Sequence, residues 1–368
     1  MKEICSICYG SVNVESVVQF DGEVICTDCF EDEVVICEYC GAQLLRDDAE
    51  YCRQRYMCQN CFEEHFVTCV DCGRVMLNEE ANYINDNYDY AYCDDCYDRR
   101  EQDFAIQNYC YKPMPIFYGD GPRFLGVELE IDDGGEDSEN ATLIKNIANK
   151  DEEYIYCKKD GSLEYGFEIV THPMTLDYHC NKLNWSRILE KASSLGYHSH
   201  QTSTCGLHIH VSRLALGQTE KEQDVVIARV LYFFEKYWDN LLKFSRRTES
   251  QLQRWANRYG FKEQPSEILD CAKKGYGGGR YTCVNLCNYS TIEFRIFRGT
   301  LKFSTLIATL QMVNHICDVA IKLSDEVLMS LTWNNFVAQI PADTYPELIS
   351  YLKERRIYEI QDSIEGEV

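Results

Sequence analysis

The chain has 368 residues, which is too long for one ordinary core and enough for two or three domains. Its 45% apolar and 26% charged residues are typical of a soluble globular protein, and no apolar run predicts a membrane span. The net charge of −24 is concentrated in residues 1–110, which hold 24 acidic and 7 basic side chains. Such an acidic stretch repels phosphate backbones, so we expect it to bind no nucleic acid.

The N-terminal sequence MKEICSICYG has no apolar signal core. Twenty-one cysteines in a long chain without such a signal favour metal binding over disulfides. We therefore expect a cytoplasmic protein that contacts no membrane.

Cysteine pairs recur through the first hundred residues. The stretches "ICSIC", "ICEYC" and "TCVDC" follow one another with a period of 32 residues, and a second pair answers each after 17, 17 and 20 residues. Two such pairs supply the four tetrahedral ligands of a closed structural zinc site. We expect three zinc ions on twelve ligands: Cys5, Cys8, Cys26, Cys29, Cys37, Cys40, Cys58, Cys61, Cys69, Cys72, Cys93 and Cys96.

These repeats resemble tandem LIM-like or treble-clef zinc modules, although the histidine pattern of true LIM modules is absent. Such modules usually bind proteins, so the resemblance implies a protein partner, and the acidity would suit a basic one. Solubility alone is an alternative explanation of the acidity. The spacing leaves open whether each repeat binds its own ion or neighbouring repeats share ligands.

Residues 104–122 contain three prolines and two glycines and are expected to form a connector. The stretch "FLGVELEI" follows, in which Val127, Leu129 and Ile131 alternate with Glu128 and Glu130. This period of two predicts a strand with an apolar face and an acidic face.

The same division recurs in three later stretches, "DGSLEYGFEIVTHP", "CGLHIHVS" and "TIEFRIFRGT". Their polar faces carry Glu164, Glu168, His208, His210, Glu293 and Arg295. If the four strands share a sheet, one face packs against helices and the other lines a cleft. Carboxylates with a few imidazoles suit Mg²⁺ or Mn²⁺, and an adjacent guanidinium suits a phosphate.

Helices are expected over 138–149, 177–195, 219–247, 304–323 and 344–357. The glycine-rich stretch "KKGYGGGRY" lacks the GK[ST] of a phosphate-binding P-loop. Lys274 and Arg280 are candidates to close over phosphates, and a disordered turn is the alternative.

Taken in order, "GVELE", "DGSLEYGFEIVTHP", "CGLHIHVS", "RYTCVNL" and "TIEFRIFRGTL" resemble the amidoligase family, over residues 118–325. That family belongs to the carboxylate–amine ligase superfamily, with glutamine synthetase and glutamate–cysteine ligase. The resemblance implies an α+β fold: a glutamine synthetase-like curved antiparallel sheet with helices on one face, preceded by the three four-cysteine zinc modules. The expected domains are 1–103 (zinc repeats), 104–122 (linker), 123–325 (catalytic domain) and 326–368 (helical extension and acidic tail).

The resemblance also implies a site for ATP and two or three Mg²⁺ ions. One metal would be held by Glu128, His208 and Glu293. A second, nearer the acceptor carboxylate, would be held by Glu130, Glu164 and Glu168. His210, Arg295 and Arg280 would contact phosphates, Arg295, Glu168 and Arg298 would act in catalysis, and Asp160 and Ser162 would touch substrate.

The implied reaction joins a carboxylate to an amine. The carboxylate attacks the γ-phosphate of ATP, and the amine then attacks the acyl phosphate to form an amide. The substrates are a carboxylate and an amine, one of which is a protein or peptide if the zinc repeats recruit it. Three alternatives remain open: an ATP phosphotransferase on the same fold, a non-enzymatic zinc-module adaptor, and a metal-dependent hydrolase or nuclease.

Overall fold

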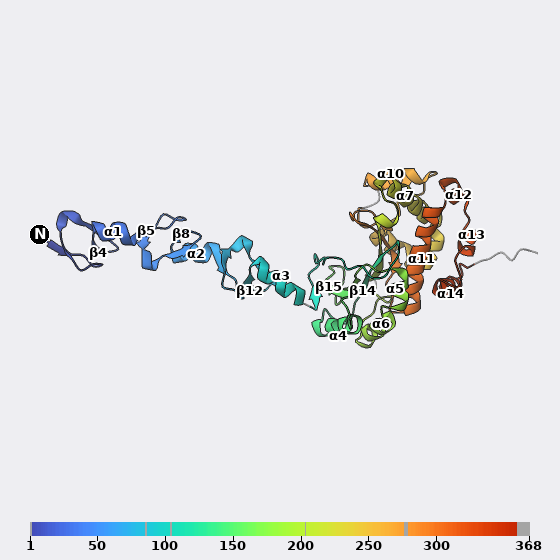
Figure 1. The fold of residues 1–368 in the computed structure, drawn as a ribbon, viewed down its shortest axis with the longest axis horizontal. Coiled ribbons are helices and arrows are strands. Elements are labelled where there is room, and N and C mark those ends of the chain that lie inside the picture. The colour runs from blue at the N-terminus through green and yellow to red at the C-terminus, as the bar shows by residue number, and fades with distance from the viewer. Residues whose placement is uncertain (1, 85–86, 104, 203, 276–278, 359–368) are drawn as a thin grey trace, which may run out of the picture. The chain divides into compact units, whose positions relative to one another are not determined.

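The structure is a computed structural model that describes residues 2–84, 87–103, 105–202, 204–275 and 279–358. The chain divides into two compact units, Met1–Asp103 and Phe104–Val368. Figure 1 shows the small hairpins and short helices of the first unit and the large helix-and-sheet assembly of the second. The centre of the glycine-rich stretch (276–278) and the acidic end of the chain (359–368) lie outside the described residues.

The first unit repeats one arrangement three times: two short antiparallel hairpins followed by a helix. The first repeat contains β1 Lys2–Ile4, β2 Ser11–Asn13, β3 Val17–Phe20, β4 Glu23–Cys26 and α1 Thr27–Glu33. The second contains β5 Val34–Ile36, β6 Gln43–Leu45, β7 Glu50–Cys52, β8 Arg55–Met57 and α2 Gln59–His65. The third contains β9 Phe66–Thr68, β10 Val75–Leu77, β11 Asn82–Ile84, β12 Asn87–Tyr92 and α3 Asp94–Asp103.

The second unit is built on a seven-stranded sheet in the order β13-β15-β16-β14-β17-β19-β18. Its strands are β13 Ile106–Gln107, β14 Leu125–Ile131, β15 Ile155–Lys158, β16 Phe167–Thr171, β17 Gly206–Ser212, β18 Val284–Asn285 and β19 Thr291–Arg298. Neighbouring strands are antiparallel except for β13 and β15. The sheet is therefore mixed rather than antiparallel, because part of the segment expected as a connector enters it as the parallel edge strand β13.

The four polar-faced strands lie side by side at the centre of this sheet, in the order β16-β14-β17-β19. Register places Glu128 opposite His208, and Glu130 opposite Glu168. His210 lies opposite Glu293. Because side chains alternate across a strand, this register gathers the acidic and imidazole groups on one face.

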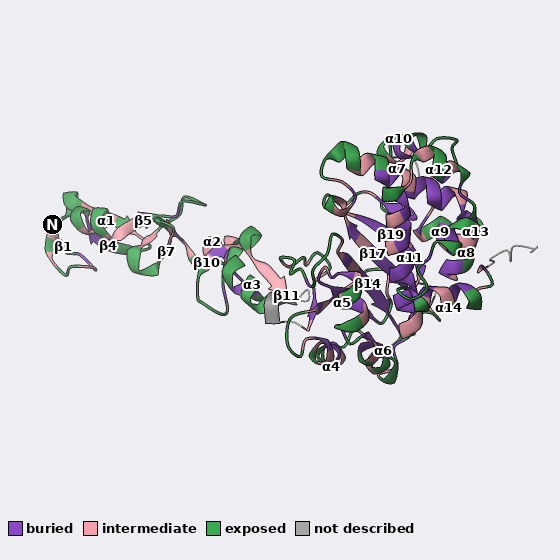
Figure 2. Ribbon diagram, turned by 45° about the vertical axis from the view of Figure 1, so that its right-hand side comes forward, coloured by how far each residue is buried: buried purple, intermediate pink, exposed green. Residues whose placement is uncertain are grey.

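The apolar face of the sheet packs into the main core. Val127, Leu129, Leu207 and Ile209 are fully buried there, together with residues of the long helix α11 Phe303–Lys322. Figure 2 shows this helix among the buried strands β14, β17 and β19. Among the described helices, α11 is the one long and apolar enough to cross a membrane, but 78% of its apolar window is buried in this unit, as in a core helix.

The remaining helices of this unit surround the same core. They are α4 Ser138–Ala148, α5 Leu176–Asn181, α6 Trp185–Ser194, α7 Glu220–Lys236, α8 Trp238–Ser245, α9 Glu249–Trp255, α10 Pro265–Lys273, α12 Asp325–Ser330, α13 Trp333–Ala338 and α14 Pro346–Glu354. The expected helix 177–195 is two helices, because Asn184 caps a new start at α6. The expected helix 219–247 is also two, since Tyr237 leaves helical geometry where its hydroxyl donates to the carbonyl of Leu331.

Candidate functional site

The twelve predicted cysteines form three separate groups of four. Within each group the Sγ atoms all lie within 4.8 Å of one another, and each group comes from one repeat. Cross-pair Sγ–Sγ distances are 3.9 Å, 3.8 Å and 3.7 Å in the three repeats. The groups fit three structural zinc ions, one per repeat, so ligands are not shared between neighbouring repeats.

Local structure explains why these thiols converge. In the first repeat, Cys5 and Cys8 lie in the turn between β1 and β2, while Cys26 ends β4 and Cys29 lies in the first turn of α1. The amide of Cys26 donates to the Cys5 sulfur at 3.3 Å. Backbone donors from Cys26 and Cys8 lower the pKa of Cys5 to about 6, which favours the thiolate that zinc requires.

The second candidate site is the polar face of the large sheet, and His208 lies at its centre. Its Nδ1 atom lies 3.6 Å from a carboxylate oxygen of Glu128 and 3.6 Å from one of Glu293. Its Nε2 atom lies 3.8 Å from Glu130. Three carboxylates, from the strands on either side of β17, therefore face one imidazole that is 4% exposed.

His210, two residues along the same strand, faces Glu128 and Glu293. Its Nε2 lies 3.2 Å from Glu128, and its Nδ1 lies 3.2 Å from the hydroxyl of Thr291. Among the described residues, His208 Nδ1 and His210 Nε2 are buried without a hydrogen-bond partner of proper geometry. Imidazole nitrogens that face carboxylates without bonding to them leave donor atoms for a shared cation.

Glu293 is the most constrained carboxylate of the face. It accepts a hydrogen bond from the side-chain amide of Asn285 at 2.7 Å and pairs with the guanidinium of Arg295. Glu130 is held differently, because it accepts from the backbone amide of Gly206. Each carboxylate thus keeps a fixed orientation, as a preorganised site requires.

The carboxylates of this face fall into two groups, one with lowered and one with raised pKa values. Burial opposes ionisation of Glu128, but His210 and His208 outweigh it and hold its pKa well below the usual range. The pKa of Glu293 is lowered in the same way, against burial, by His210, His208 and Arg295. Burial, with the charge of Glu128, raises the pKa of Glu168 well above its ordinary value, and burial raises that of Glu130.

Several predicted site residues lie outside this cluster. Glu164 is exposed and lies in a bend before β16, because the strand begins only at Phe167. At Gly166, just before the strand, a Cβ atom would lie 1.9 Å from the carbonyl oxygen of Ile131, so only glycine fits there. The strand predicted through Glu164 therefore begins three residues later, at Phe167, and Glu164 lies outside it.

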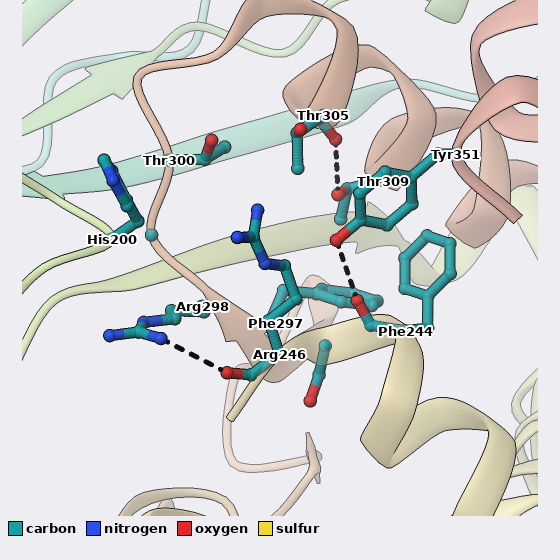
Figure 3. A pocket seen from close by; sticks show the side chains of 11 residues that line it. His200, Phe244, Arg246, Phe297, Arg298, Thr300, Thr305, Thr309 and Tyr351 are labelled. Atoms are coloured by element: carbon teal, nitrogen blue, oxygen red, sulfur yellow. Dashed lines mark hydrogen bonds between the residues drawn. The ribbon is translucent and has the colours of Figure 1, made fainter. Parts of the chain in front are cut away.

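The remaining candidates occupy the borders of the face. Arg298 ends β19 and lines a separate pocket shown in Figure 3. Arg280 donates to the hydroxyl of Tyr109, whose ring lies 6.0 Å from Lys158 Nζ. Asp160 accepts from Ser162, and its charge helps raise the pKa values of Glu130 and Glu168.

Sequence reasoning missed Lys158, the cation nearest to Glu168. Its Nζ lies 3.1 Å from Glu168 and 3.9 Å from Glu128, and the residue is 8% exposed. The four-residue strand β15 carries a usable signal, since apolar Ile155 and Cys157 alternate with Tyr156 and Lys158. Asn285 could not be predicted from alternation, because its strand, β18, has only two residues.

The donors of the face fit a divalent cation. Two overlapping groups, Glu128–His210–Glu293 and Glu128–Glu168–His208, each bring their ligand atoms within 4.8 Å of one another. Carboxylate oxygens are the ligands that Mg²⁺ prefers, and Mn²⁺ also accepts imidazole. The orphaned imidazole nitrogens are consistent with such a cation, so the residues present fit Mg²⁺ or Mn²⁺.

Residues 146–316 match the family model described as "Putative amidoligase enzyme". The matched segment includes Glu168, His208 and Glu293, and it begins after Glu128 and Glu130. A solved structure of a bifunctional glutathione synthetase from Pasteurella multocida is similar at 12% identity and a TM-score of 0.33. The alignment covers 65% of this chain and 47% of that chain, so this chain spans about half the length of the synthetase.

None of the curated proteins matches the chain. The family match spans three of the four strands that carry the polar face, β16, β17 and β19. The resemblance predicted from the strand motifs is therefore confirmed for residues 146–316, which match the amidoligase family model.

Proposed function

We propose that the chain is an ATP- and Mg²⁺-dependent carboxylate–amine ligase that forms an amide bond through an acyl phosphate. The observation that carries the proposal is the convergence of five side chains on one face of the sheet: the buried Glu168, Glu293 and His208 and the half-buried Glu128 and His210. A glutamine synthetase-like arrangement of this sheet belongs to the same proposal. Support comes from the family match over residues 146–316.

The carboxylates divide into two metal-binding sets. Glu128 and Glu293, with His208 between them, would hold one ion, and Glu130 with Glu168, without Glu164, would hold a second. When bound, such ions neutralise phosphate oxygens and align them for transfer. Lys158 keeps the carboxylate of Glu168 oriented toward this face.

The basic side chains beside these carboxylates would bind the phosphates of ATP. Arg295 is fixed by Glu293 through one terminal nitrogen, which leaves its other donors for a phosphate oxygen. His210, with its Nδ1 near the Thr291 hydroxyl, presents Nε2 to the same region. These donors stabilise the charge that moves toward the β-phosphate as the γ-phosphoryl group departs.

The reaction balances in two steps. An oxygen of the acceptor carboxylate attacks the γ-phosphorus, the bond to the β-phosphate oxygen breaks, and ADP leaves. The amine nitrogen then attacks the acyl carbon, the bond to the phosphate oxygen breaks, and phosphate leaves as the nitrogen loses a proton. The burial of Glu130, Glu168 and Glu293 supports exclusion of water, which would otherwise hydrolyse the acyl phosphate.

The test is ATP turnover by the full chain with Mg²⁺ or Mn²⁺ and pooled amines and carboxylates. We expect metal-dependent turnover that falls at least a hundredfold in Glu128→Gln and His208→Ala, because each removes a metal ligand. The exposed Glu139→Gln, on α4, is the matched control and should keep wild-type turnover. Absence of both ATP binding and ATP cleavage in the wild type would contradict the proposal, and a phosphorylated acceptor without amide would indicate a phosphotransferase.

We further propose that the three zinc repeats recruit a protein or peptide substrate to this ligase. The support is their composition: residues 1–110 carry a net charge of −17, and none of the closed four-cysteine groups offers an open catalytic position. Deletion of residues 1–105 should raise KM for that substrate and leave kcat unchanged. An unchanged KM would contradict recruitment.

A further inference from the structure

A pocket of this unit lies beside the polar face of the sheet and is lined by basic side chains and hydroxyls. Arg246, at the end of α8, and Arg298, at the end of β19, meet His200 there. Figure 3 shows the Arg246 guanidinium pointing toward Thr300, Thr305 and Thr309. These residues come from four separate chain segments, so the pocket is formed by the tertiary fold and not by a single loop.

The arginines of this pocket have no acidic partners. In the described part of the chain, no carboxylate lies within ion-pairing distance of Arg246 or Arg298, although acidic residues outnumber basic ones by 60 to 36. Instead, Arg298 donates weakly to the backbone carbonyl of Arg246 at 3.4 Å. The two charges also lower the pKa of His200, after burial, which is consistent with their closeness to its ring. Neighbouring cations without a carboxylate partner favour an anion supplied from outside.

Hydrogen-bond donors complete the pocket. Thr305, in the first turn of the 20-residue helix α11, is 5% exposed, and its hydroxyl has no partner among the described residues. That helix has no side-chain cap at its N-terminus. A buried orphan hydroxyl and an uncapped helix start both stabilise a negative group placed beside them.

The pocket adjoins the carboxylates through two glycines. Gly206 donates its amide to Glu130 and lies opposite Arg298 in the ladder between β17 and β19. A side chain at Gly299, in the pocket wall, would collide with Ser199, whose hydroxyl donates to the carbonyl of Glu130. The pair Gly206–Arg298 thus separates the pocket from Glu130. Glu130 lies at the end of the polar face where the acceptor carboxylate is proposed to bind.

We infer that this pocket binds a second carboxylate of the acceptor, so that the ligase acts on acceptors bearing two carboxylates. The inference rests on the proposed function for the identity of the acceptor. One carboxylate of the acceptor lies at the metal-binding face, while the other forms paired hydrogen bonds with Arg246 and Arg298 and accepts from the Thr305 hydroxyl. The pocket thereby selects the substrate class and fixes which of the two carboxylates is activated.

The test compares dicarboxylates with monocarboxylates of equal length by calorimetric titration of the full chain without nucleotide. The probes are succinate, glutarate and adipate against butyrate, valerate and hexanoate. We expect at least one dicarboxylate to bind tenfold or more tightly than its monocarboxylate. This preference should disappear in Arg246→Asn, which tolerates the left-handed backbone at this position (φ 61°), and in Arg298→Met, and persist in the exposed Arg187→Gln.

Titration of the same variants with the magnesium complex of a non-hydrolysable ATP analogue separates the possible failures. A dicarboxylate preference without analogue binding would support the pocket while contradicting the ATP-dependent function. No preference at any chain length, or a preference that survives both arginine variants, would overturn the inference. Weaker binding of the analogue in Arg246→Asn, with dicarboxylate binding unchanged, would also overturn it, because the pocket would then hold a nucleotide phosphate.

Discussion

The two units of this protein solve the same stability problem in opposite ways. In the zinc repeats the buried apolar clusters are very small, and cysteines form half or more of each: the first consists of Cys5, Ile25 and Cys26. The second unit instead buries one continuous core that runs from the apolar face of the sheet to α11 and α14. A core of three to six residues cannot offset the conformational entropy of folding, so metal binding must supply the difference.

The two units differ in whether their buried polar groups are free to take part in chemistry. In the repeats every buried thiol is committed to holding the fold, so those sites are closed. In the second unit the large core stabilises a sheet whose other face carries Glu128, Glu168 and Glu293 beside His208, His210 and Arg295, and burial with the charge of Glu128 still raises the pKa of Glu168. Like charges this close are tolerated only on a scaffold that is stable without them.

Removal of zinc should have the largest effect, and it should unfold the repeats while leaving the second unit folded. Structural zinc contributes about 10–16 kcal/mol in small zinc-finger peptides, so chelation or Cys37→Ser should unfold the affected repeats. The four tryptophans, Trp185, Trp238, Trp255 and Trp333, all belong to the second unit, so their fluorescence reports that unit alone. We expect chelation to release three zinc ions per chain with unchanged tryptophan emission. A shift in that emission on chelation would show that the sheet depends on the repeats.

A core truncation in the second unit should have the complementary effect. Phe234 is fully buried on α7, with its ring centroid 5.5 Å from that of Phe294. Phe234→Ala should therefore lower the free energy of unfolding by about 3–5 kcal/mol, measured by urea denaturation with tryptophan fluorescence. The half-exposed Phe261→Ala is the matched control with a smaller effect. Zinc content should stay at three ions per chain, and a loss of zinc would contradict the independence of the units.

A smaller loss of stability is expected when the second unit is acidified. The group responsible is His179, which is fully buried. Its Nε2 lies 3.0 Å from the carbonyl of Leu125, and its Nδ1 accepts from the indole of Trp185 at 3.3 Å. Burial lowers its pKa from 6.5 to about 4. Between these values the unfolded chain binds the proton that the folded chain excludes, so stability falls as the pH falls from 6.5 to 4.

At about 1.4 kcal/mol per pH unit, this histidine accounts for a loss of roughly 3 kcal/mol across that window. Urea denaturation at a series of pH values, followed by tryptophan fluorescence, measures it. His179→Gln should flatten the slope in the same window. An identical slope in the variant would show that His179 is not the group responsible.

The zinc ligands could be predicted residue by residue because each set is local. Two thiols three residues apart share one turn, so spacing alone groups Cys5 with Cys8 and Cys26 with Cys29. The choice between one ion per repeat and shared ligands could not be made from spacing, since it depends on how each hairpin folds back on its own helix.

The polar face of the sheet could be predicted where alternation is unbroken, as at Glu128, His208 and Glu293. It failed at Glu164, because the predicted strand ran through Glu164 and Gly166, whereas β16 begins only at Phe167. It also missed Lys158, whose strand is only four residues long and whose charge has the pattern of a surface residue. The pocket around Arg246 and Arg298 joins segments about fifty residues apart, and no local pattern predicts that meeting.

The most direct test of the account is a crystal of the full chain soaked with ATP and Mn²⁺, with the manganese located by anomalous diffraction. We predict manganese between Glu128, His208 and Glu293, with the triphosphate beside His210 and Arg295. Nucleotide bound elsewhere, with no manganese on the polar face of the sheet, would contradict it.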